Sequence, residues 1–425
     1  MLKYIHDEDK IKKLISEVWE NNHSSFYTKK YKDVGLNKED LLNIKNFQKI
    51  PFLTRKELEE VHPDERLFIK PEEISFVAYT SGTTSNNPVI TYFSDVDNYY
   101  FDPSLGLDVK KLLITYPPLN KNFGHTFIQQ CKQGNRKITP IFADYQNLPN
   151  SAFLAGKLEI DAIYATPTIA SQLVEHIDKY YDRNKIKLLA LGSETLTPAK
   201  RDFLKKAYPN AKIANLYASS EIGQFILFPC KEIIKNGDNL FHLLAPPLLA
   251  TEIIDGELVL TYANNKAMPL IRYRTGDFFE ETKEPCSCSN KGPLLKWSGR
   301  KGVDKIRING LEIKVDDVEK AFQEIISLIG DKYQIHFYSS TKDSIETVDL
   351  VVEVENKQLL EKSALLENIK TMVINHLMNN WYLTPTVNLE EIIKRKIFSS
   401  IKINILEKLS FTGDKTKRLI THLND

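Results

Sequence analysis

Residues 79–88 carry the most suggestive chemistry in the chain. They read Tyr-Thr-Ser-Gly-Thr-Thr-Ser-Asn-Asn-Pro, so that hydroxyl side chains surround a glycine. Glycine lets the backbone approach a ligand closely, successive amide groups can point toward an anion, and hydroxyls add neutral donors. The segment is therefore a candidate for binding a polyphosphate, although a loop that only turns the chain fits this composition equally well.

The segments around this loop favour an α/β sheet that would position it. Residues 74–78, Ile-Ser-Phe-Val-Ala, alternate as a strand does, so the loop is expected to leave the edge of a sheet. From there to about residue 300, short apolar runs alternate with amphipathic stretches, which predicts strands joined by crossover helices. The predicted strands include 111–116, 160–165 and 185–191, and the predicted helices include 168–180 and 197–207.

The two ends of the chain show other patterns. Helical spacing with charged faces over 7–31 and 38–46 predicts helices that cover the edge of a larger domain. Beyond residue 240 helical patterns become scarce, and antiparallel strands and hairpins are expected. After residue 305 a compact α+β unit is expected, with only the motif near residue 415 beyond it. Its predicted helices are 315–328 and 358–379, and its predicted strands are 333–338 and 347–354.

Composition excludes several classes of function. The chain has 425 residues, enough for one large and one smaller domain. Its 57 Lys and Arg nearly balance its 56 Asp and Glu, so no basic excess indicates nucleic acid as a partner. No apolar stretch approaches the ~20 residues that span a bilayer, and the first ten residues lack the apolar core of a secretory signal. We expect a cytoplasmic protein without membrane contact, whose four cysteines are thiols or metal ligands.

Further motifs follow the hydroxyl-rich loop in a fixed order. Together they resemble the signature motifs of the adenylate-forming superfamily, which includes acyl-CoA synthetases, peptide-synthetase adenylation domains and luciferases. The resemblance covers about residues 20–425, and the segments 26–31 and 268–277 with a following Cys-x-Cys resemble phenylacetate–CoA ligases. The motifs are 215–223 (Asn-Leu-Tyr-Ala-Ser-Ser-Glu-Ile-Gly), 255–261, 271–277 (Ile-Arg-Tyr-Arg-Thr-Gly-Asp), 299–300, 306–310 and 411–418.

This resemblance implies an architecture and a reaction. The fold would be α/β, with a large N-terminal domain over residues 1–302 that holds α/β sheets and a distorted β-barrel-like part. A small mobile α+β domain, residues 303–425, would rotate about a hinge among residues 302–304. A carboxylate would attack the α-phosphate of ATP to give an acyl-adenylate and pyrophosphate, and a thiol would then displace AMP. Catalysis must therefore neutralise charge and hold an in-line geometry.

The resemblance also assigns residues to the phosphates and the nucleotide. The loop that cradles the β- and γ-phosphates would be Thr80, Ser81, Gly82, Thr83 and Thr84. This loop is one residue longer than the usual pattern, and Val89 stands where many members have lysine. Ser193 and Glu194 match the strand-end turn beside the nucleotide.

Three assignments fall in the motif that ends at Gly223. Tyr217 matches the aromatic residue that packs on adenine, and Ser220 matches the residue that bonds the α-phosphate or the acyl carboxylate. Glu221 matches the acid that helps to bind Mg²⁺, a hard ion that prefers carboxylate and phosphate oxygens. Without the motif, a core tyrosine and a solvated glutamate would be the ordinary interpretations.

The remaining assignments lie in the second half of the chain. Asp277 would accept hydrogen bonds from the vicinal ribose hydroxyls, and Arg300 would reach the ribose or phosphate. Gly310 would line the thiol tunnel. Lys415, in a segment similar to Ser-Gly-Lys-x-x-Arg, would bridge the substrate carboxylate and the α-phosphate, where charge develops. A lysine so near a chain end is otherwise commonly irrelevant, and Lys417 is a weaker candidate on register.

The acid and the acceptor are less defined by the sequence. Position in the family indicates that Phe123, His125 and Phe127 line the acyl pocket, although His125 is equally well explained as a structural histidine. We expect a small, aromatic carboxylic acid, with CoA as the acceptor. A stand-alone adenylating enzyme that loads a carrier-protein phosphopantetheine is the first alternative, and a degenerate nucleotide-binding regulator is the second. The oligomeric state is open, with a homodimer among the choices.

Four further residues could form a structural zinc site. On an extended segment the side chains of Cys286 and Cys288 point the same way and can share an ion. Cys230 and His242 lie in a segment that can fold back to meet them, an order that phenylacetate–CoA-ligase-like sequences often show. Three thiolates and an imidazole would close a tetrahedral Zn²⁺ site. Four unrelated residues are the alternative, and Cys131 is expected to be a core thiol.

Overall fold

The computed structural model describes two compact units. The first comprises Met1–Leu196 and Lys200–Ser298, and the second holds Gly299–Asp425. The functional domain boundary after residue 302 stays a prediction. None of the described helices is long and apolar enough to cross a membrane. The described residues are 2–422 without 81–87, 95–101, 116–130, 132–137, 194–195, 197, 238, 244–247, 283–285, 289–293, 301–304, 309–310, 343–344, 385–386, 396 and 410–417.

The first unit combines a large mixed sheet with helices. Its strands are β1 (Leu2–Ile5), β2 (Ile74–Tyr79), β3 (Ile90–Ser94), β4 (Lys111–Thr115), β5 (Thr139–Phe142), β6 (Ala162–Ala165), β7 (Leu188–Gly192), β8 (Lys212–Ser219), β9 (Gln224–Phe228), β10 (Leu240–Leu243), β11 (Leu248–Ile254), β12 (Glu257–Tyr262), β13 (Leu270–Glu281) and β14 (Leu294–Arg300). Its helices are α1 (Glu8–Trp19), α2 (Phe26–Asp33), α3 (Lys38–Leu42), α4 (Arg55–Glu60), α6 (Leu148–Leu158), α7 (Pro167–Ile177), α8 (Pro198–Ala207) and α9 (Lys231–Asn236), with short 3₁₀ turns between some of them.

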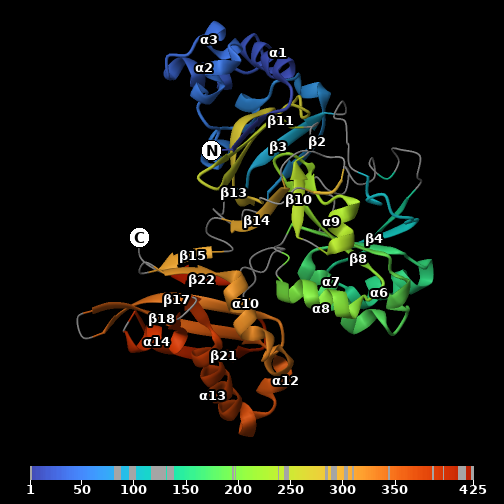
Figure 1. Cartoon of the computed structure of the whole chain (residues 1–425), viewed down its shortest axis with the longest axis vertical. Coiled ribbons are helices and arrows are strands. Elements are labelled where there is room, and N and C mark those ends of the chain that lie inside the picture. The colour runs from blue at the N-terminus through green and yellow to red at the C-terminus, as the bar shows by residue number, and fades with distance from the viewer. Residues whose placement is uncertain are drawn as a thin grey trace. The chain divides into compact units, whose positions relative to one another are not determined.

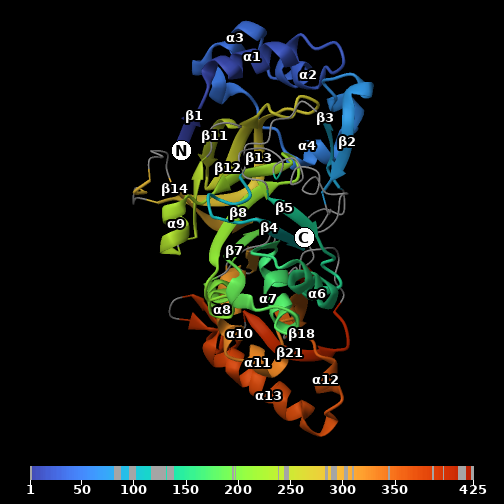
Figure 2. The same cartoon turned by 90° about the vertical axis from the view of Figure 1, so that its right-hand side faces the viewer.

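The parallel half of the large sheet consists of the strand–helix repeats that the sequence predicts. The described strands join in the order β1-β11-β12-β13-β14-β10-β9-β8-β7-β6-β4-β5, and those from β8 to β5 are parallel. Helices α6, α7 and α8 pack on one face of these strands (Figures 1 and 2). Successive residues of a strand face opposite sides of the sheet. Ile163 therefore packs against the helices, and Tyr164 packs in the apolar cluster on the other face of the sheet. The predicted α/β fold class is confirmed.

The antiparallel half curves back toward the parallel half. Strand β8 pairs antiparallel with β9, and the sheet continues through β10, β14, β13, β12, β11 and β1. Three strands separate β8 from β13 in this order, which would hold them far apart in a flat sheet with strands about 4.8 Å apart. Side chains of β8 and β13 are nevertheless hydrogen bonded to each other. The sheet is therefore strongly curved, in keeping with the predicted barrel-like part.

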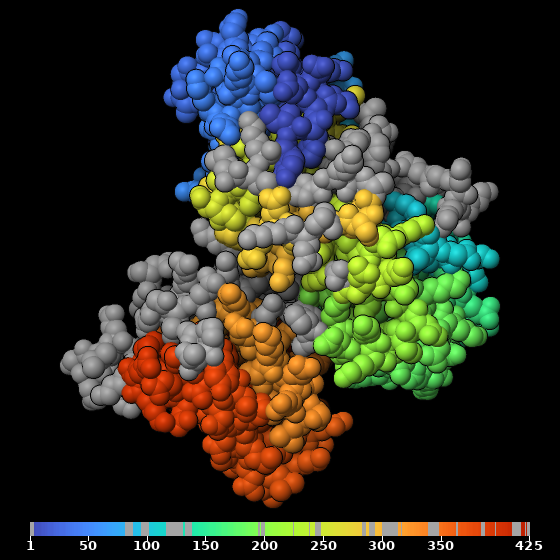
Figure 3. Space-filling model, in the orientation of Figure 1, coloured from blue at the N-terminus to red at the C-terminus, as the bar shows by residue number. Residues whose placement is uncertain are grey.

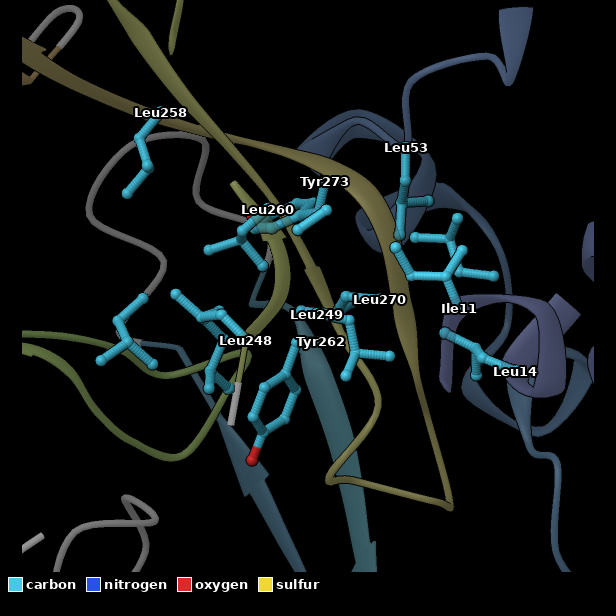
Figure 4. Close-up of a cluster of buried hydrophobic side chains, with 14 of the residues drawn as sticks. Ile11, Leu14, Leu53, Leu248, Leu249, Leu258, Leu260, Tyr262, Leu270 and Tyr273 are labelled. Carbon is cyan, nitrogen blue, oxygen red and sulfur yellow. The ribbon is translucent and has the colours of Figure 1, made fainter. Parts of the chain in front are cut away.

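A buried apolar cluster fills this curved region and joins it to the N-terminal helices. Figure 4 shows Ile11 and Leu14 of α1 beside Leu53 and the β13 residue Leu270. All four side chains are at most 5% exposed. Burial of apolar area on this scale is the main force that fixes the helices on the sheet. The N-terminal residues form one compact group at an end of this unit (Figure 3).

The helical spacing over 7–31 corresponds to two helices and not to a continuous one. Helix α1 ends at Trp19 and α2 begins at Phe26. Between them the Asn21 side-chain oxygen accepts hydrogen bonds from the amides of His23 (2.8 Å) and Ser24 (2.9 Å). Asparagine offers the backbone this alternative to helical hydrogen bonds, and the turn that results separates the helices.

The second unit is an α+β unit around a four-stranded sheet with the order β21-β18-β17-β22 (Figure 1). Helices α10 and α13 contribute to its buried core. Its strands are β15 (Lys305–Ile308), β16 (Leu311–Lys314), β17 (Tyr333–Lys342), β18 (Ile345–Glu355), β19 (Tyr382–Thr384), β20 (Val387–Asn388), β21 (Phe398–Leu406) and β22 (Leu419–His422). Its helices are α10 (Val315–Gln323), α11 (Ile326–Ile329), α12 (Lys357–Leu360), α13 (Ser363–Asn380) and α14 (Leu389–Lys394).

The expectation that only the terminal motif lies beyond α13 is wrong. Strand β21 runs parallel to β18 along most of its length, and α14 precedes it. The alternation of Ile401, Ile403 and Ile405 with polar residues is the signal of this strand. The residues that follow α13 thus complete the sheet of this unit.

Candidate functional site

Glu221 lies in the tight turn that connects β8 to β9. The amide of Gly223 donates to the carbonyl of Ser219 (2.9 Å), and Gly223 has φ +79°, which favours glycine. Glu221 is only 4% exposed, so its carboxylate needs hydrogen-bonding partners. Its Oε1 accepts from Arg55 Nη1 (3.1 Å) and from the Tyr273 hydroxyl (3.2 Å), and its Oε2 accepts from the Ser219 hydroxyl.

Arg55 links this carboxylate to the start of the hydroxyl-rich loop. Its Nη2 donates to Thr80 Oγ1 (3.2 Å), while Nε donates to Glu59 Oε1 (2.7 Å). Thr80 Oγ1 in turn accepts from the amide of Val89 at 2.9 Å. One guanidinium therefore joins two motifs that are far apart in the sequence.

Sequence analysis misses Arg55, which belongs to none of the recognised motifs. The structure positions it because the segment before α4 pairs with β13. The amide of Leu53 donates to the Arg272 carbonyl (3.0 Å), and the Leu53 carbonyl accepts from the amide of Arg274 (2.9 Å). Thr54 then caps α4 together with Glu57, so the helix and its first residue, Arg55, begin beside β13.

Asp277 and Tyr217 form a second buried polar pair. The Tyr217 hydroxyl donates to Asp277 Oδ2 at 2.6 Å. Tyr217 is 7% exposed and Asp277 is 5% exposed. Asp277 follows Gly276, which has φ +74°. The amide of Gly276 donates a hydrogen bond to Glu257 Oε1 (2.9 Å). The pairing of β12 and β13 is irregular here. An irregularity of this kind turns a side chain away from its regular direction, here toward Tyr217.

The ring of Tyr217 packs against other aromatic rings. It meets Phe279 edge-to-face with centroids 5.1 Å apart, and it lies 5.8 Å from Trp297. Tyr217 is thus a buried core residue whose hydroxyl also belongs to the polar site. These surroundings are compatible with a core tyrosine and with a tyrosine of the nucleotide site. Its packing on adenine stays a prediction.

Two other predicted residues lie at the carboxyl ends of parallel strands. Ser193 directly follows β7 and has φ +64°, a conformation that costs free energy for a residue other than glycine. Ser220 is half-buried at the end of β8, next to Glu221. In open α/β sheets, ligands bind at the carboxyl ends of the strands, where these residues lie.

The four predicted metal ligands come together. The ligand atoms of Cys230, His242, Cys286 and Cys288 all lie within 4.8 Å of one another. The sulfurs of Cys230 and Cys286 are 3.5 Å apart, and Cys288 Sγ lies 3.3 Å from His242 Nε2. Bonds of about 2.3 Å from Zn²⁺ to two thiolates at tetrahedral angles would separate the sulfurs by about 3.7 Å. The arrangement therefore fits a tetrahedral ion.

The thiols of this cluster differ in acidity. Burial raises the pKa of Cys230 to about 11 and lowers the pKa of His242. Burial also acts to raise the pKa of Cys286, but hydrogen bonds from the amide of Cys288 and from Cys230 lower it below its usual value. His242 is 2% exposed, which holds its ring in a fixed position. A bound cation would favour the thiolate form of each cysteine.

Several predicted site residues lie outside the described residues. They comprise Ser81, Gly82, Thr83 and Thr84 of the loop, Glu194, the acyl-pocket residues Phe123, His125 and Phe127, Gly310 and Lys415. The side chain of Arg300 is also not described. The roles given to these residues stay predictions.

Comparison with known proteins identifies the family. A family model described as "AMP-binding enzyme" matches residues 5–251, which is more than half of the chain. This chain belongs to the AMP-binding enzyme family. The match includes the hydroxyl-rich loop, Arg55, Tyr217 and Glu221, whereas their partners Tyr273 and Asp277 lie beyond the matched residues of this AMP-binding enzyme.

Individual relatives of the AMP-binding enzyme are distant. It is 24% identical to the phenylacetate-coenzyme A ligase of Pseudomonas putida over 82% of this chain and 83% of that protein. It is 23% identical to the ligase of that name from Thermus thermophilus, over 82% and 80% of the two chains. The fold is similar to the crystal structure of 2-hydroxyisobutyryl-CoA ligase in complex with 2-HIB-AMP, with a TM-score of 0.74 and 18% sequence identity. The superposition includes 97% of this chain and 88% of that ligase.

Proposed function

We propose that this enzyme, an AMP-forming acid–thiol ligase, uses ATP to activate a small aromatic or arylacetic acid and transfers the acyl group to CoA. One observation carries the proposal: Arg55 hydrogen bonds to both Thr80 and Glu221. Through this side chain the start of the candidate phosphate loop meets the acid of the Tyr-Ala-Ser-Ser-Glu motif. A hydroxyl, a cation and a buried carboxylate in contact can together bind a nucleoside triphosphate and its metal ion.

The residues would divide the work of adenylate formation. Asp277 would accept hydrogen bonds from the ribose hydroxyls, and Thr80 with the loop that follows it would bind the β- and γ-phosphates. Glu221 would hold Mg²⁺, which when bound neutralises charge on the phosphates. Lys415 would bind the carboxylate and the α-phosphate as they approach, so that repulsion between two anions is offset.

Arg55 would exchange partners when ATP binds. Its bond to Glu221 neutralises a buried carboxylate while no phosphate is present. Two oxygens of a phosphate group would offer the guanidinium a stronger, bidentate partner, and Glu221 would then turn to the metal ion. Arg55 would therefore bind ATP without taking part in acyl transfer.

Replacing Arg55 by lysine is expected to lower kcat/KM for ATP in adenylate formation about tenfold. An ammonium keeps the charge but cannot offer a phosphate group the two parallel N–H donors of the guanidinium. The measurement is ATP–pyrophosphate exchange as a function of ATP concentration. Lys56→Arg is the matched control, because Lys56 lies next in α4 and its side chain is 79% exposed. An unchanged kcat/KM for ATP in the Arg55 variant would contradict the role.

The class of acid rests on the relatives and on the ring-rich segment around residues 123–127. The curated relatives named above are phenylacetate-coenzyme A ligases, and that segment has no carboxylate that would bind an amino group. The test is pyrophosphate exchange with benzoates, arylacetates, a fatty acid and an aliphatic amino acid at equal concentrations. Exchange with benzoates or arylacetates is expected. Exchange with the fatty acid or the amino acid alone would overturn the aromatic assignment.

Two alternatives are distinguished by related measurements. An enzyme that loads a carrier-protein phosphopantetheine would form the adenylate but would not discharge it to free CoA. A nucleotide-binding regulator would bind ATP but show no exchange with any acid in the panel. The presence of Lys415 beside Glu221 and Asp277 in the motif set favours a working enzyme, because a regulator that only binds ATP has no need of a lysine that acts on the acid and the α-phosphate.

We further propose that the Cys/His cluster binds a structural Zn²⁺. Cys230 precedes α9, His242 lies in β10, and the two remaining cysteines lie between β13 and β14. His242 pairs with Phe228 of β9 and Leu294 of β14. An ion here would tie together the strands that follow the Glu221 turn. A set of four protein ligands leaves no position for catalysis.

Elemental analysis is expected to find about one zinc per chain, and Cys286→Ser should remove most of it. That variant should lower the melting temperature by about 5 °C or more, while kcat at saturating substrate changes less than about threefold. Cys131→Ala is the control, since Cys131 is buried in the apolar cluster around Tyr164 and should leave the zinc content unchanged. Purified protein without stoichiometric zinc would refute the site.

A further inference from the structure

Arg418 is a buried charged residue at the start of a short C-terminal strand. Strand β22 begins at Leu419 and lies parallel to β17, with Leu419 opposite Ile335 (Figure 1). Arg418 is 7% exposed, and Glu319 of α10, which lies beside it, is 5% exposed. Taking two charges out of water is costly unless close partners compensate them.

The contacts of Arg418 fix it against β17 and α10. Its Nη1 donates to the Tyr333 carbonyl (2.8 Å), and its own carbonyl accepts from the amide of Ile335 (2.8 Å). Its Nε lies 3.7 Å from Glu319 Oε1. The guanidinium lies 4.0 Å from the centre of the Tyr333 ring, which stacks on Phe322 at 4.0 Å. Because Phe322 covers one face of Tyr333, the guanidinium covers the other.

These contacts define the register of β22. A slip by one residue would turn the core-facing side chains to the other face, and burial of one face excludes it. A slip by two residues keeps the same face toward the core, so specific contacts must exclude it. A buried guanidinium has its carboxylate, carbonyl and ring partners at one register only. Each residue of slip moves the chain by about 3.3 Å along the sheet. The Arg418 contacts therefore fix the position of the residue that directly follows segment 410–417 in the chain.

We propose that Arg418 is a positioning residue for Lys415. The inference rests on the proposed function, in which Lys415 acts in adenylate formation. Lys415 precedes Arg418 by three residues and lies outside the described residues. A displacement of about 1 Å can cost about a hundredfold in rate when a group must meet reacting atoms. Arg418 thus contributes to catalysis through Lys415 and touches neither ATP nor the acid.

The test compares the two half-reactions in the full-length enzyme. Arg418→Met should lower adenylate formation at saturating ATP and acid at least about tenfold, while transfer from pre-made acyl-adenylate to CoA stays within about threefold. Arg418→Lys retains the charge beside Glu319 and should recover part of the loss. Arg395→Met is the control, since Arg395 pairs with Glu391 on the exposed surface of α14 in the same unit. It should leave both half-reactions unchanged.

A double variant separates positioning from general stability. If Arg418 acts only through Lys415, adding Arg418→Met to Lys415→Ala should slow adenylate formation by less than about twofold further. Full additivity, or equal loss in both half-reactions, would overturn the positioning role. If Arg418→Met does not fold, Arg418→Lys is compared in the same cycle. An unchanged rate in Lys415→Ala itself would instead refute the proposed role of Lys415, on which the inference rests.

Discussion

Replacing Lys415 by alanine is expected to slow adenylate formation by at least about a hundredfold. The first half-reaction brings the anionic carboxylate to the anionic α-phosphate, and the lysine is the residue proposed to bind both. Transfer from pre-made acyl-adenylate to CoA should change by less than about threefold, because the small domain would then have rotated Lys415 away. The two rates are measured separately, by pyrophosphate exchange and by thioester formation from synthetic adenylate.

Lys417→Ala provides a matched control for this experiment. It removes the same charge two residues later in the same segment, so it tests whether position or net charge matters. It should change adenylate formation by less than about threefold. Equal loss of both half-reactions in the Lys415 variant would contradict the rotating-domain mechanism, and a larger loss in the Lys417 variant would show that the register of the motif is different.

Replacing Asp277 by asparagine is expected to lower kcat/KM for ATP about a hundredfold. A carboxylate accepts two charge-assisted hydrogen bonds from vicinal hydroxyls, each contributing about 1.5–3 kcal/mol, whereas an amide presents one acceptor and one donor group. The Tyr217 hydroxyl, which donates to Asp277 at 2.6 Å, holds the carboxylate in place and would lose a charged partner. The measurement is the ATP dependence of pyrophosphate exchange.

Use of 2′-deoxy-ATP makes the ribose assignment specific. The unaltered enzyme should prefer ATP over 2′-deoxy-ATP by at least about tenfold, and Asp277→Asn should lose most of that preference. Tyr217→Phe, which retains the ring among Phe279 and Trp297 but removes the hydrogen bond to Asp277, should keep most of the preference, because the carboxylate itself remains. If Asp277→Asn weakens both nucleotides equally, then the residue supports the site without contacting the ribose.

Sequence reasoning groups the four residues of the Cys/His cluster and singles out Tyr217, Glu221 and Asp277, but it misses Arg55. Cys-x-Cys is a local signal, and the pairing of Tyr217 with Asp277 joins two recognisable motifs. The contact of Arg55 with Glu221 spans 166 positions and depends on a single backbone pairing of Leu53 with β13. The residues around Arg55 carry no local pattern that predicts this pairing, because such long-range contacts depend on how the sheet curves.

Periodic apolar patterns predict where the helices and strands lie, whereas the points at which such patterns break are not evident from the sequence. The strand–helix repeats from β4 to β8 are predictable because buried parallel strands read as apolar runs. The break between α1 and α2 depends on one asparagine side chain, whose choice between solvent and backbone is invisible in the sequence. The alternating isoleucines of β21 indicate a strand, and the expected α+β unit lacks it together with the short strands β19 and β20.

The central claim is that ATP is cleaved to AMP in step with thioester formation. The direct test incubates the full-length enzyme with ATP, Mg²⁺, CoA and either phenylacetate or benzoate, and quantifies the nucleotide and the acyl-CoA by chromatography and mass spectrometry. Equal amounts of AMP and acyl-CoA are expected with at least one of the two acids, and neither product is expected when the acid or ATP is omitted. Formation of ADP and phosphate, or AMP without an acyl-CoA thioester, would contradict this claim.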